Sequence, residues 1–274
     1  MKKLLTLMIA VVALVACSSE DEEENRVSVR FRVTANDWSV VTRALTADGQ
    51  DMTDLWIFDY MGGTLVGTTH KTSADADFDT PMLAMKNGTH TVYFVASRGK
   101  TPTVSGTTIT WQQPSDTFWK TVTVDVAPGG NETVSVVLDR VVTRLRVSIA
   151  DEVPTGAAQL VMTPGSWWYG LDYLTGAAVG EQQNERAVSI PASFVGTTSL
   201  VASIFGFSDS DEWVTDVTIT AKDGDGNSMG TVTLADVPFV RNRTTEVSGS
   251  LFGGDTPFAI SLNGEWLTPH TVEW

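Results

Sequence analysis

Short stretches in which apolar residues alternate with polar ones recur along nearly the whole chain. In the first of them, at 26–34, apolar side chains share one face and polar side chains share the other. A period of two residues over this length predicts a half-buried β-strand, because successive side chains of a strand point to opposite faces. Valine and threonine dominate these stretches, as expected on a pleated surface. The alternation returns at 54–60, 88–97, 119–126, 132–138, 140–150, 200–207, 215–222, 230–235, 243–252 and 258–262.

Turn-forming residues separate these stretches, as at 128–131, 223–227 and 253–255, which is the usual punctuation between strands. No window after the N-terminal segment keeps a helical apolar period for three turns. The best helical piece is 80–88, with Pro near its start and Gly at its end, and a second possible turn of helix begins at Ser115-Asp116. The sequence therefore predicts a nearly all-β chain of sandwiches or barrels.

The strand pattern divides into two sets of similar length. A boundary between Asp139 and Arg140 leaves an N-terminal β-sandwich at 26–139 and a C-terminal β-sandwich at 140–253. Each half then has the usual size of a domain and its own set of strands. Residues 254–274 remain as a separate C-terminal strand segment.

The N-terminal segment has the anatomy of a secretory signal. Lys2 and Lys3 are followed by an apolar run at 4–15 and then by Cys17. The run is too short to remain as a membrane-spanning helix, which takes about 20 residues, and it is typical of a cleaved export signal. Leu-Val-Ala-Cys at 14–17 resembles a bacterial lipoprotein box, which implies that residues 1–16 are removed and that Cys17 carries lipid.

An acidic run follows the predicted lipid site at 20–24. It resembles the export signal that places lipoproteins on the outer face of Bacteroidetes-type outer membranes. Residues 17–25 are predicted to form a solvated tether, because their like charges repel and they contain nothing apolar to bury. We expect a lipid-anchored, surface-exposed protein of the cell outer membrane.

The overall charge and the single cysteine exclude several functions. The net charge is −15, and so acidic a surface repels the phosphate backbone of nucleic acids. Cys17 is the only cysteine, so once its sulfur is lipidated no disulfide, cysteine metal site or cysteine nucleophile is left. The chain must then be held together by its own apolar cores.

Little in the sequence points to catalysis. His70, His90 and His270 lie far apart, and none belongs to a metal-binding or catalytic spacing. The segment 223–227 begins like a calcium loop, but Leu234 stands where a bidentate Glu is needed, so a β-turn is the favoured interpretation. We expect no enzyme, no cofactor and no metal site.

An aromatic-rich stretch allows two interpretations. Trp167, Trp168, Tyr169 and Tyr173 are flanked by glycines, and exposed aromatics on loops could stack on sugar rings or bind a partner. Core and inter-domain packing is the favoured alternative, because aromatic side chains are mostly buried.

Several motifs together resemble the fimbrillin superfamily of Bacteroidetes-type fimbriae, and most closely its minor, anchor-like subunits. The likeness spans about residues 27–252, and the order and spacing of its motifs agree with the lipoprotein box. The motifs lie at 52–60 with 62–66, at 115–119 leading into 138–145, and at 240–243 before the strand 245–251.

This resemblance implies two tandem transthyretin-like β-sandwiches that assemble by strand exchange, in which an extended segment of one subunit fills the groove of another. Phe258, Ile260 and Leu262 have the alternation of such a donor strand, although a last strand that pairs within its own domain fits equally well. Polymerising family members are cut after an arginine beyond the first strand. The matching site here is Arg43-Ala44, whereas anchor members keep the first strand and the lipid.

We therefore expect a cell-surface lipoprotein that serves as an anchor or accessory subunit of a fimbria with a role in cell adhesion. Its partners would be other fimbrial subunits, the outer membrane through Cys17, and a host or microbial surface glycan or protein. The alternative is a polysaccharide-binding surface lipoprotein that uses the aromatics at 167–173.

Overall fold

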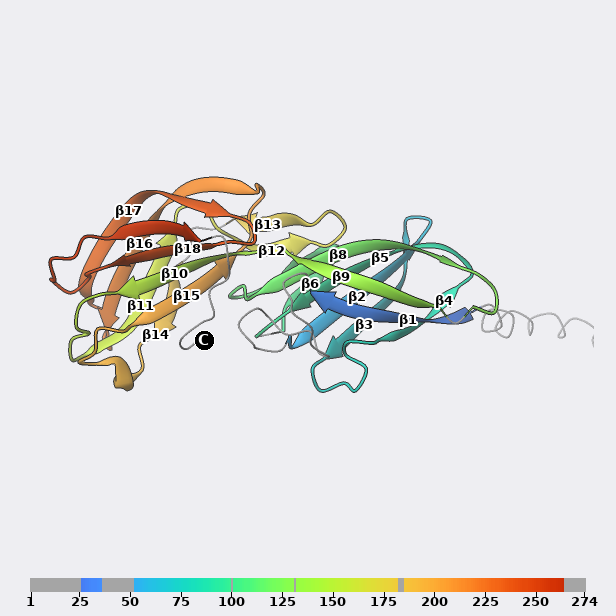
Figure 1. The fold of residues 1–274 in the computed structure, drawn as a ribbon, viewed down its shortest axis with the longest axis horizontal. Coiled ribbons are helices and arrows are strands. Elements are labelled where there is room, and N and C mark those ends of the chain that lie inside the picture. Colours follow the sequence, from blue (N-terminus) through green and yellow to red (C-terminus); the bar gives the residue numbers. More distant parts are fainter. Residues whose placement is uncertain (1–25, 36–51, 100, 131, 182–184, 264–274) are drawn as a thin grey trace, which may run out of the picture.

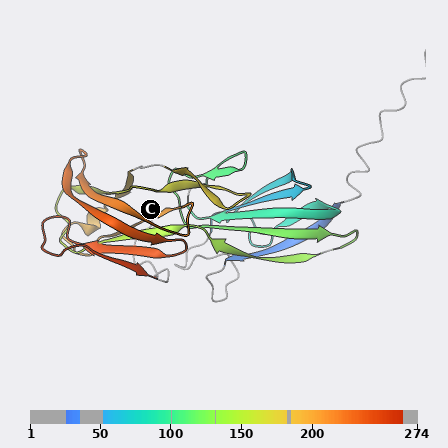
Figure 2. The same ribbon diagram turned by 90° about the horizontal axis from the view of Figure 1, so that it is seen from above.

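The structure is a computed structural model, and it describes residues 26–35, 52–99, 101–130, 132–181 and 185–263. Strands make up most of these residues, which confirms the predicted all-β fold. The one helical element in this part of the chain is a short 3₁₀ turn, η1 (Ala192–Phe194). Within the same residues there is no helix long and apolar enough to span a membrane. Two strand-rich halves lie end to end along the long axis (Figures 1 and 2).

The N-terminal half is a seven-stranded sheet that folds into two layers. Its strand order is β3-β2-β5-β8-β9-β1-β4. The sheet bends between β8 and β9, which pair only at Phe118↔Arg140 and Trp119↔Asp139. Buried side chains from both layers form one core, including Phe31, Phe94 and Leu138. The strands are β1 (Arg26–Ala35), β2 (Asp54–Met61), β3 (Thr64–Thr72), β4 (Met82–Lys86), β5 (Gly88–Ser97), β8 (Thr117–Val126) and β9 (Thr133–Arg140).

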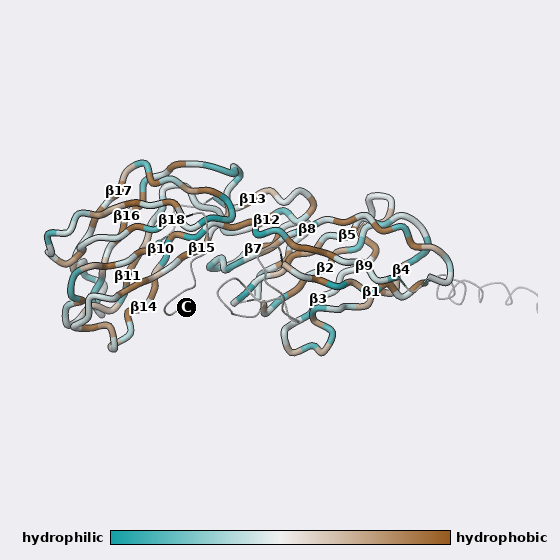
Figure 3. The backbone as a smooth tube through the Cα atoms, viewed as in Figure 1, coloured by the Kyte–Doolittle hydropathy of each residue, from teal (hydrophilic) through white to brown (hydrophobic). Residues whose placement is uncertain are grey.

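The C-terminal half has two four-stranded sheets, β14-β11-β16-β17 and β15-β10-β18-β19. They enclose a second core that includes Leu145, Val247 and Phe239. Apolar segments run along the strands of both halves, and many of the turns are polar (Figure 3). The strands are β10 (Thr143–Ile149), β11 (Ala157–Pro164), β14 (Arg186–Ser189), β15 (Val201–Gly206), β16 (Glu212–Asp223), β17 (Ser228–Val240), β18 (Thr244–Gly249) and β19 (Ala259–Asn263).

A small additional sheet joins the two halves. It has the order β13-β12-β7-β6, so that β7 of the N-terminal half pairs with β12 of the C-terminal half. A third apolar cluster lies around this sheet and takes side chains from both halves, including Phe58, Trp111, Val142, Tyr173 and Phe207. Its strands are β6 (Thr103–Ser105), β7 (Thr108–Thr110), β12 (Trp168–Asp172) and β13 (Ala177–Glu181).

The strand orders of the two halves correspond position by position. The layer β3-β2-β5-β8 matches β14-β11-β16-β17, and β9-β1-β4 matches β18-β10-β15. In both halves the first strand lies between a parallel and an antiparallel neighbour: β1 between β9 and β4, and β10 between β18 and β15. The C-terminal half has one strand more, because β19 pairs with the far edge of β18.

Two sequence predictions of helix are wrong. The segment predicted at 80–88 contains the edge strand β4, in which Leu83 and Met85 are buried and Met82 is exposed, and which pairs antiparallel with β1. Its residues are good helix formers, but the unpaired edge of β1 needs a strand beside it, and this tertiary demand outweighs local propensity. At Ser115-Asp116 the chain makes no helical turn and leads directly into β8.

Candidate assembly site

The C-terminal strand β19 pairs antiparallel with β18 of its own half. Ile260 lies opposite Val247, and Leu262 lies opposite Thr245. Val247 is fully buried, yet Ile260 and Leu262 remain 39% and 44% exposed. Only Phe258, just before the strand, packs against the core. An apolar face is thus incompletely covered at the edge of the C-terminal half.

The loop between β18 and β19 is held by a carboxylate that the sequence did not single out. Asp151 accepts the backbone N–H of Leu251 at 2.9 Å, of Phe252 at 2.6 Å and of Gly254 at 3.2 Å. Partial burial acts to raise the pKa of Asp151, but these N–H groups outweigh it and hold the pKa below its usual range. The position of β19 therefore depends in part on one ionised side chain.

The first strand, β1, is built deeply into the N-terminal half. Its residues 30–35 pair in parallel with β9, and its residues 26–30 pair antiparallel with β4. Val29, Phe31 and Val33 are buried in the core. The predicted lipid site Cys17 and the predicted cleavage site Arg43-Ala44 lie outside the described residues. Loss of β1 would remove a strand from between two neighbours and open the core.

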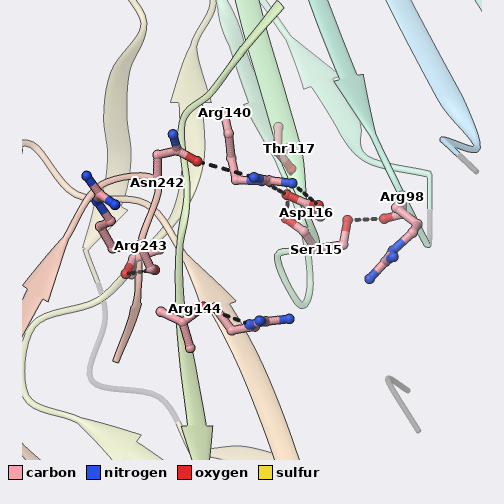
Figure 4. A network of polar contacts seen from close by, with 10 residues as sticks. Arg98, Ser115, Asp116, Thr117, Arg140, Arg144, Asn242 and Arg243 are labelled. Atoms are coloured by element: carbon pink, nitrogen blue, oxygen red, sulfur yellow. Dashed lines mark hydrogen bonds and ion pairs between the residues drawn. The ribbon is translucent and has the colours of Figure 1, made fainter. Parts of the chain in front are cut away.

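A buried ion pair lies where the two halves meet (Figure 4). The Arg140 guanidinium donates from Nε to Asp116 Oδ1 at 2.6 Å and from Nη2 to Asp116 Oδ2 at 3.0 Å. Its Nη1 donates to Asn242 Oδ1 at 3.2 Å. The guanidinium carbon also lies 4.6 Å from the centre of the Phe118 ring. Both charged side chains are almost completely buried. Water cannot solvate them there, and the ion pair compensates for the lost hydration.

Backbone hydrogen bonds reinforce this contact. Asn242 N–H donates to Val142 O at 2.9 Å, and Arg144 N–H donates to Arg243 O at 3.1 Å. Asn242 has a φ of 58°, a left-handed conformation that asparagine tolerates better than most residues. Two of the three motifs that carried the family resemblance, 115–119 leading into 138–145 and 240–243, thus meet in space. Sequence order could not reveal their contact.

The aromatic stretch is largely enclosed. Trp167 is buried in the C-terminal core and donates from Nε1 to Phe205 O at 3.0 Å. Tyr173 is buried in the cluster that joins the halves, stacked on Phe58 with ring centres 3.7 Å apart. Trp168 and Tyr169 are half-buried. Neither Trp167 nor Tyr173 has a free face for a sugar, and their positions agree with the packing interpretation.

The segment 223–227 forms the turn of the β16–β17 hairpin. The Asp223 carboxylate accepts the backbone N–H of Asp225 at 3.0 Å and of Asn227 at 2.8 Å, so its oxygens are used within the turn. Over the part of the chain that the structure describes, no group of three or more His, Cys, Asp or Glu side chains is placed to hold a metal ion.

Comparisons with known proteins identify the fold. No family model and no curated protein matches the sequence. A Bacteroides ovatus structure described as a "putative adhesin" aligns with 92% of this chain and 97% of its own, at 13% identity and a TM-score of 0.53. A Bacteroides thetaiotaomicron structure described as "putative polysaccharide binding proteins" aligns with 87% of this chain and 96% of its own, at 11% identity and a TM-score of 0.53. At identities this low, these similarities show a shared fold.

The fimbrial anchor protein Mfa2 of Porphyromonas gingivalis also aligns, covering 87% of this chain and 98% of its own at 10% identity and a TM-score of 0.49. The two Bacteroides structures confirm the all-β sandwich fold that the fimbrillin resemblance implies.

Proposed function

We propose that this chain is a non-enzymatic cell-surface lipoprotein that serves as an anchor or accessory subunit of a fimbria and assembles with other subunits through strand exchange. The observation that carries the proposal is β19, a terminal strand that pairs through one edge and leaves Ile260 and Leu262 partly exposed. The Bacteroides structure that shares this fold and is described as an adhesin supports a role in cell adhesion.

The internal correspondence of the two halves supports β19 as a donor. The N-terminal half encloses its core with seven strands, and their counterparts in the C-terminal half are complete without β19. Release of β19 would therefore break one ladder of main-chain hydrogen bonds and expose little of the apolar core. In another subunit the same ladder could be rebuilt, with alternate side chains filling pockets.

The burial of β1 supports the anchor over the polymerising subunit. Four of its side chains are buried, and both of its edges are paired. A cut after Arg43 would leave this strand bound by the same contacts, so cleavage alone would not free it. An intact chain keeps β1 and the lipid on Cys17 together.

The first experiment determines the mature N-terminus. Protein isolated from its native membrane should begin at Cys17 and carry lipid, as read by mass spectrometry. A chain that begins at Ala44 would contradict the anchor and make the protein a released, polymerising subunit. Fimbriae that stay on the membrane in a Cys17→Ser variant would also contradict it.

The second experiment tests the donor strand. Ile260→Asp together with Leu262→Asp should abolish recovery of partner subunits with the affinity-purified protein, because charges cannot enter apolar pockets. Ser261→Asp is the matched control, since Ser261 points to the other face of β19, opposite Glu246. Equal recovery with both proteins would contradict strand donation.

Polysaccharide binding is the alternative function. The similarity to the Bacteroides protein described as polysaccharide-binding favours it, whereas the burial of Trp167 and Tyr173 removes two of its four predicted contacts. A glycan array with a Trp168→Ala control separates the two functions, because the alternative requires a sugar that binds the parent and not the variant.

A further inference from the structure

The edge of β9 that faces away from β1 has free main-chain groups. The parallel ladder of the two strands includes the hydrogen bond from Arg30 N–H to Glu132 O at 2.9 Å. Alternate residues of a parallel strand direct their N–H and C=O groups to the same neighbour. By this alternation Ser135 and Val137 direct theirs away from β1.

Nothing pairs with this edge over Thr133–Leu138 within the described chain. β8 lies on that side, but it pairs with β9 only at residues 139 and 140, so the two strands diverge beyond that point. Val122 of β8 and Val134 of β9 are half-buried at the margin of the core where the strands diverge. The exposed edge carries no charged side chain between Thr133 and Leu138. It combines unpaired main-chain groups with an incompletely covered apolar margin.

The C-terminal half shows what fits at this position. Its strands β17 and β18 correspond to β8 and β9, and β19 pairs with the edge of β18 that corresponds to the free edge of β9. Phe258, next to β19, packs close to Gly249, where an added Cβ would lie 2.6 Å from the Phe258 ring. In the N-terminal half β8 pairs with β9 only at residues 139 and 140, and no described strand pairs with this edge of β9 over Thr133–Leu138.

We propose that the free edge of β9 is an acceptor for an extended, uncharged segment of a partner subunit whose apolar residues alternate as Phe258, Ile260 and Leu262 do. The segment pairs antiparallel with β9, as β19 pairs with β18, and bonds to the main chain of Ser135 and Val137. Its apolar side chains cover Val122 and Val134. This edge can accept a strand while β1 is in place, so no cleavage is required. The inference rests on the proposed function only for the identity of the partner.

The experiment uses the intact chain and a synthetic peptide of residues 257–264, Pro-Phe-Ala-Ile-Ser-Leu-Asn-Gly. Binding is measured by fluorescence anisotropy, and the amides that become protected are located by hydrogen exchange. The matched variants are Ser135→Pro and Ser135→Ala. Proline removes an N–H that points to the free edge and is tolerated at such positions, whereas alanine keeps that N–H. Thermal melts check that both variants fold.

We expect the peptide to protect the amides of Ser135 and Val137, and Ser135→Pro to weaken its binding by about tenfold, the effect of one lost main-chain hydrogen bond that leaves an unpaired group. Ser135→Ala should bind as the parent does. A peptide with aspartate in place of Ile260 and Leu262 should not bind.

Three results would overturn the acceptor: no binding by the parent chain, equal binding by the proline and alanine variants, or protection confined to 244–249, which would mean that the peptide replaces β19. The outcome is independent of whether the chain is lipidated or found in fimbriae, so failure of the acceptor and failure of the proposed function are distinguishable.

Discussion

Arg140 and Asp116 form a bidentate ion pair whose two side chains are only 2% and 3% exposed. Removal of either partner would take from the other a buried, charge-assisted contact that water cannot replace. The cost of breaking such a pair by truncation exceeds what the pair itself contributes, because an uncompensated buried charge is left behind. The exposed pair Lys120–Asp139, at 38% and 45% exposure, should behave quite differently.

We predict that Arg140→Ala lowers the free energy of unfolding by about 3 kcal/mol, measured by chemical denaturation. Lys120→Ala, which breaks the exposed pair, should cost less than about 1 kcal/mol. Similar losses in the two variants would contradict the importance that we assign to burial.

From the hydrogen bonds of Asp151 we predict that the loop leading to β19 becomes less stable as pH falls. Its pKa is lower in the folded chain than in the unfolded chain, so the carboxylate stabilises the folded state above the unfolded pKa, and this stabilisation is lost as pH falls. The protection of the Leu251, Phe252 and Gly254 amides, relative to their intrinsic exchange rates, should fall below about pH 4. Asp151→Asn should show the lower protection at neutral pH and lose about 1 kcal/mol of stability, since the site is partly exposed. Unchanged protection in the variant would refute this role.

At the scale of elements, the two terminal strands differ in how strongly the fold depends on them. β1 is paired on both sides and contributes four buried side chains, whereas β19 is paired on one side and leaves two large apolar side chains partly exposed. Burial of apolar area is the main favourable term in folding. The N-terminal half should therefore require β1, and the C-terminal half should tolerate loss of β19.

Deletion of residues 255–274 should leave a folded protein whose melting temperature falls by only a few degrees, about what the loss of 1 kcal/mol produces in a protein of this size. Replacement of Phe31 by Asp in β1 should instead prevent the N-terminal half from folding, because it buries an unpaired charge. Circular dichroism and limited proteolysis would distinguish the two. Unfolding of the chain that lacks 255–274 would contradict release of β19.

At the scale of the whole molecule, the shared sheet and its aromatic cluster couple the two halves. Tyr173 stacks on Phe58 and donates its hydroxyl proton to Gly106 O at 3.2 Å. The Tyr60 hydroxyl lies 3.1 Å from the Tyr173 hydroxyl, within hydrogen-bond distance. Trp119 Nε1 donates to Tyr173 O at 2.8 Å. One residue of the C-terminal half thus contacts three aromatic residues of the N-terminal half.

Tyr173→Ala should cost about 3 to 4 kcal/mol, the usual range for a buried aromatic residue, and should split a single calorimetric unfolding transition into two. Tyr173→Phe keeps the stacking and should preserve one transition. A single transition in both variants would show that the halves are coupled by other contacts.

For Tyr173 we also predict that the folded state loses stability at alkaline pH. Burial first, and then the hydrogen bond with Tyr60, raises the pKa of Tyr173 above its ordinary value. A raised folded pKa means that the stabilisation is present below the unfolded pKa of about 10 and is lost as pH rises past it. Tyr173→Phe should lose less stability than the parent between about pH 9 and pH 11. Equal losses would contradict the assignment.

The sequence predicted most of the long strands because alternation is a local property that survives in any β-sandwich. Gly88–Ser97 was predicted with the bounds of β5, and Arg26–Thr34 within one residue of β1. The short strands β6, β7, β12 and β13 carry no sustained alternation. They form one sheet because β7 of the N-terminal half pairs with β12 of the C-terminal half. Met82–Lys86 was misread because its residues favour a helix when no neighbouring strand is considered.

By itself, the sequence determined that the chain is nearly all-β, that its strands fall into two sets, and that three separated motifs resemble those of one family, because these properties depend on residue order alone. The tertiary structure decided which strands are neighbours, because pairing joins residues far apart in the chain. It placed Asp116, Arg140 and Asn242 in one buried contact, enclosed Trp167 and Tyr173, and paired β19 with β18. The free edge of β9 can be recognised only in the tertiary structure, because whether a strand lacks a neighbour depends on how the whole sheet is assembled.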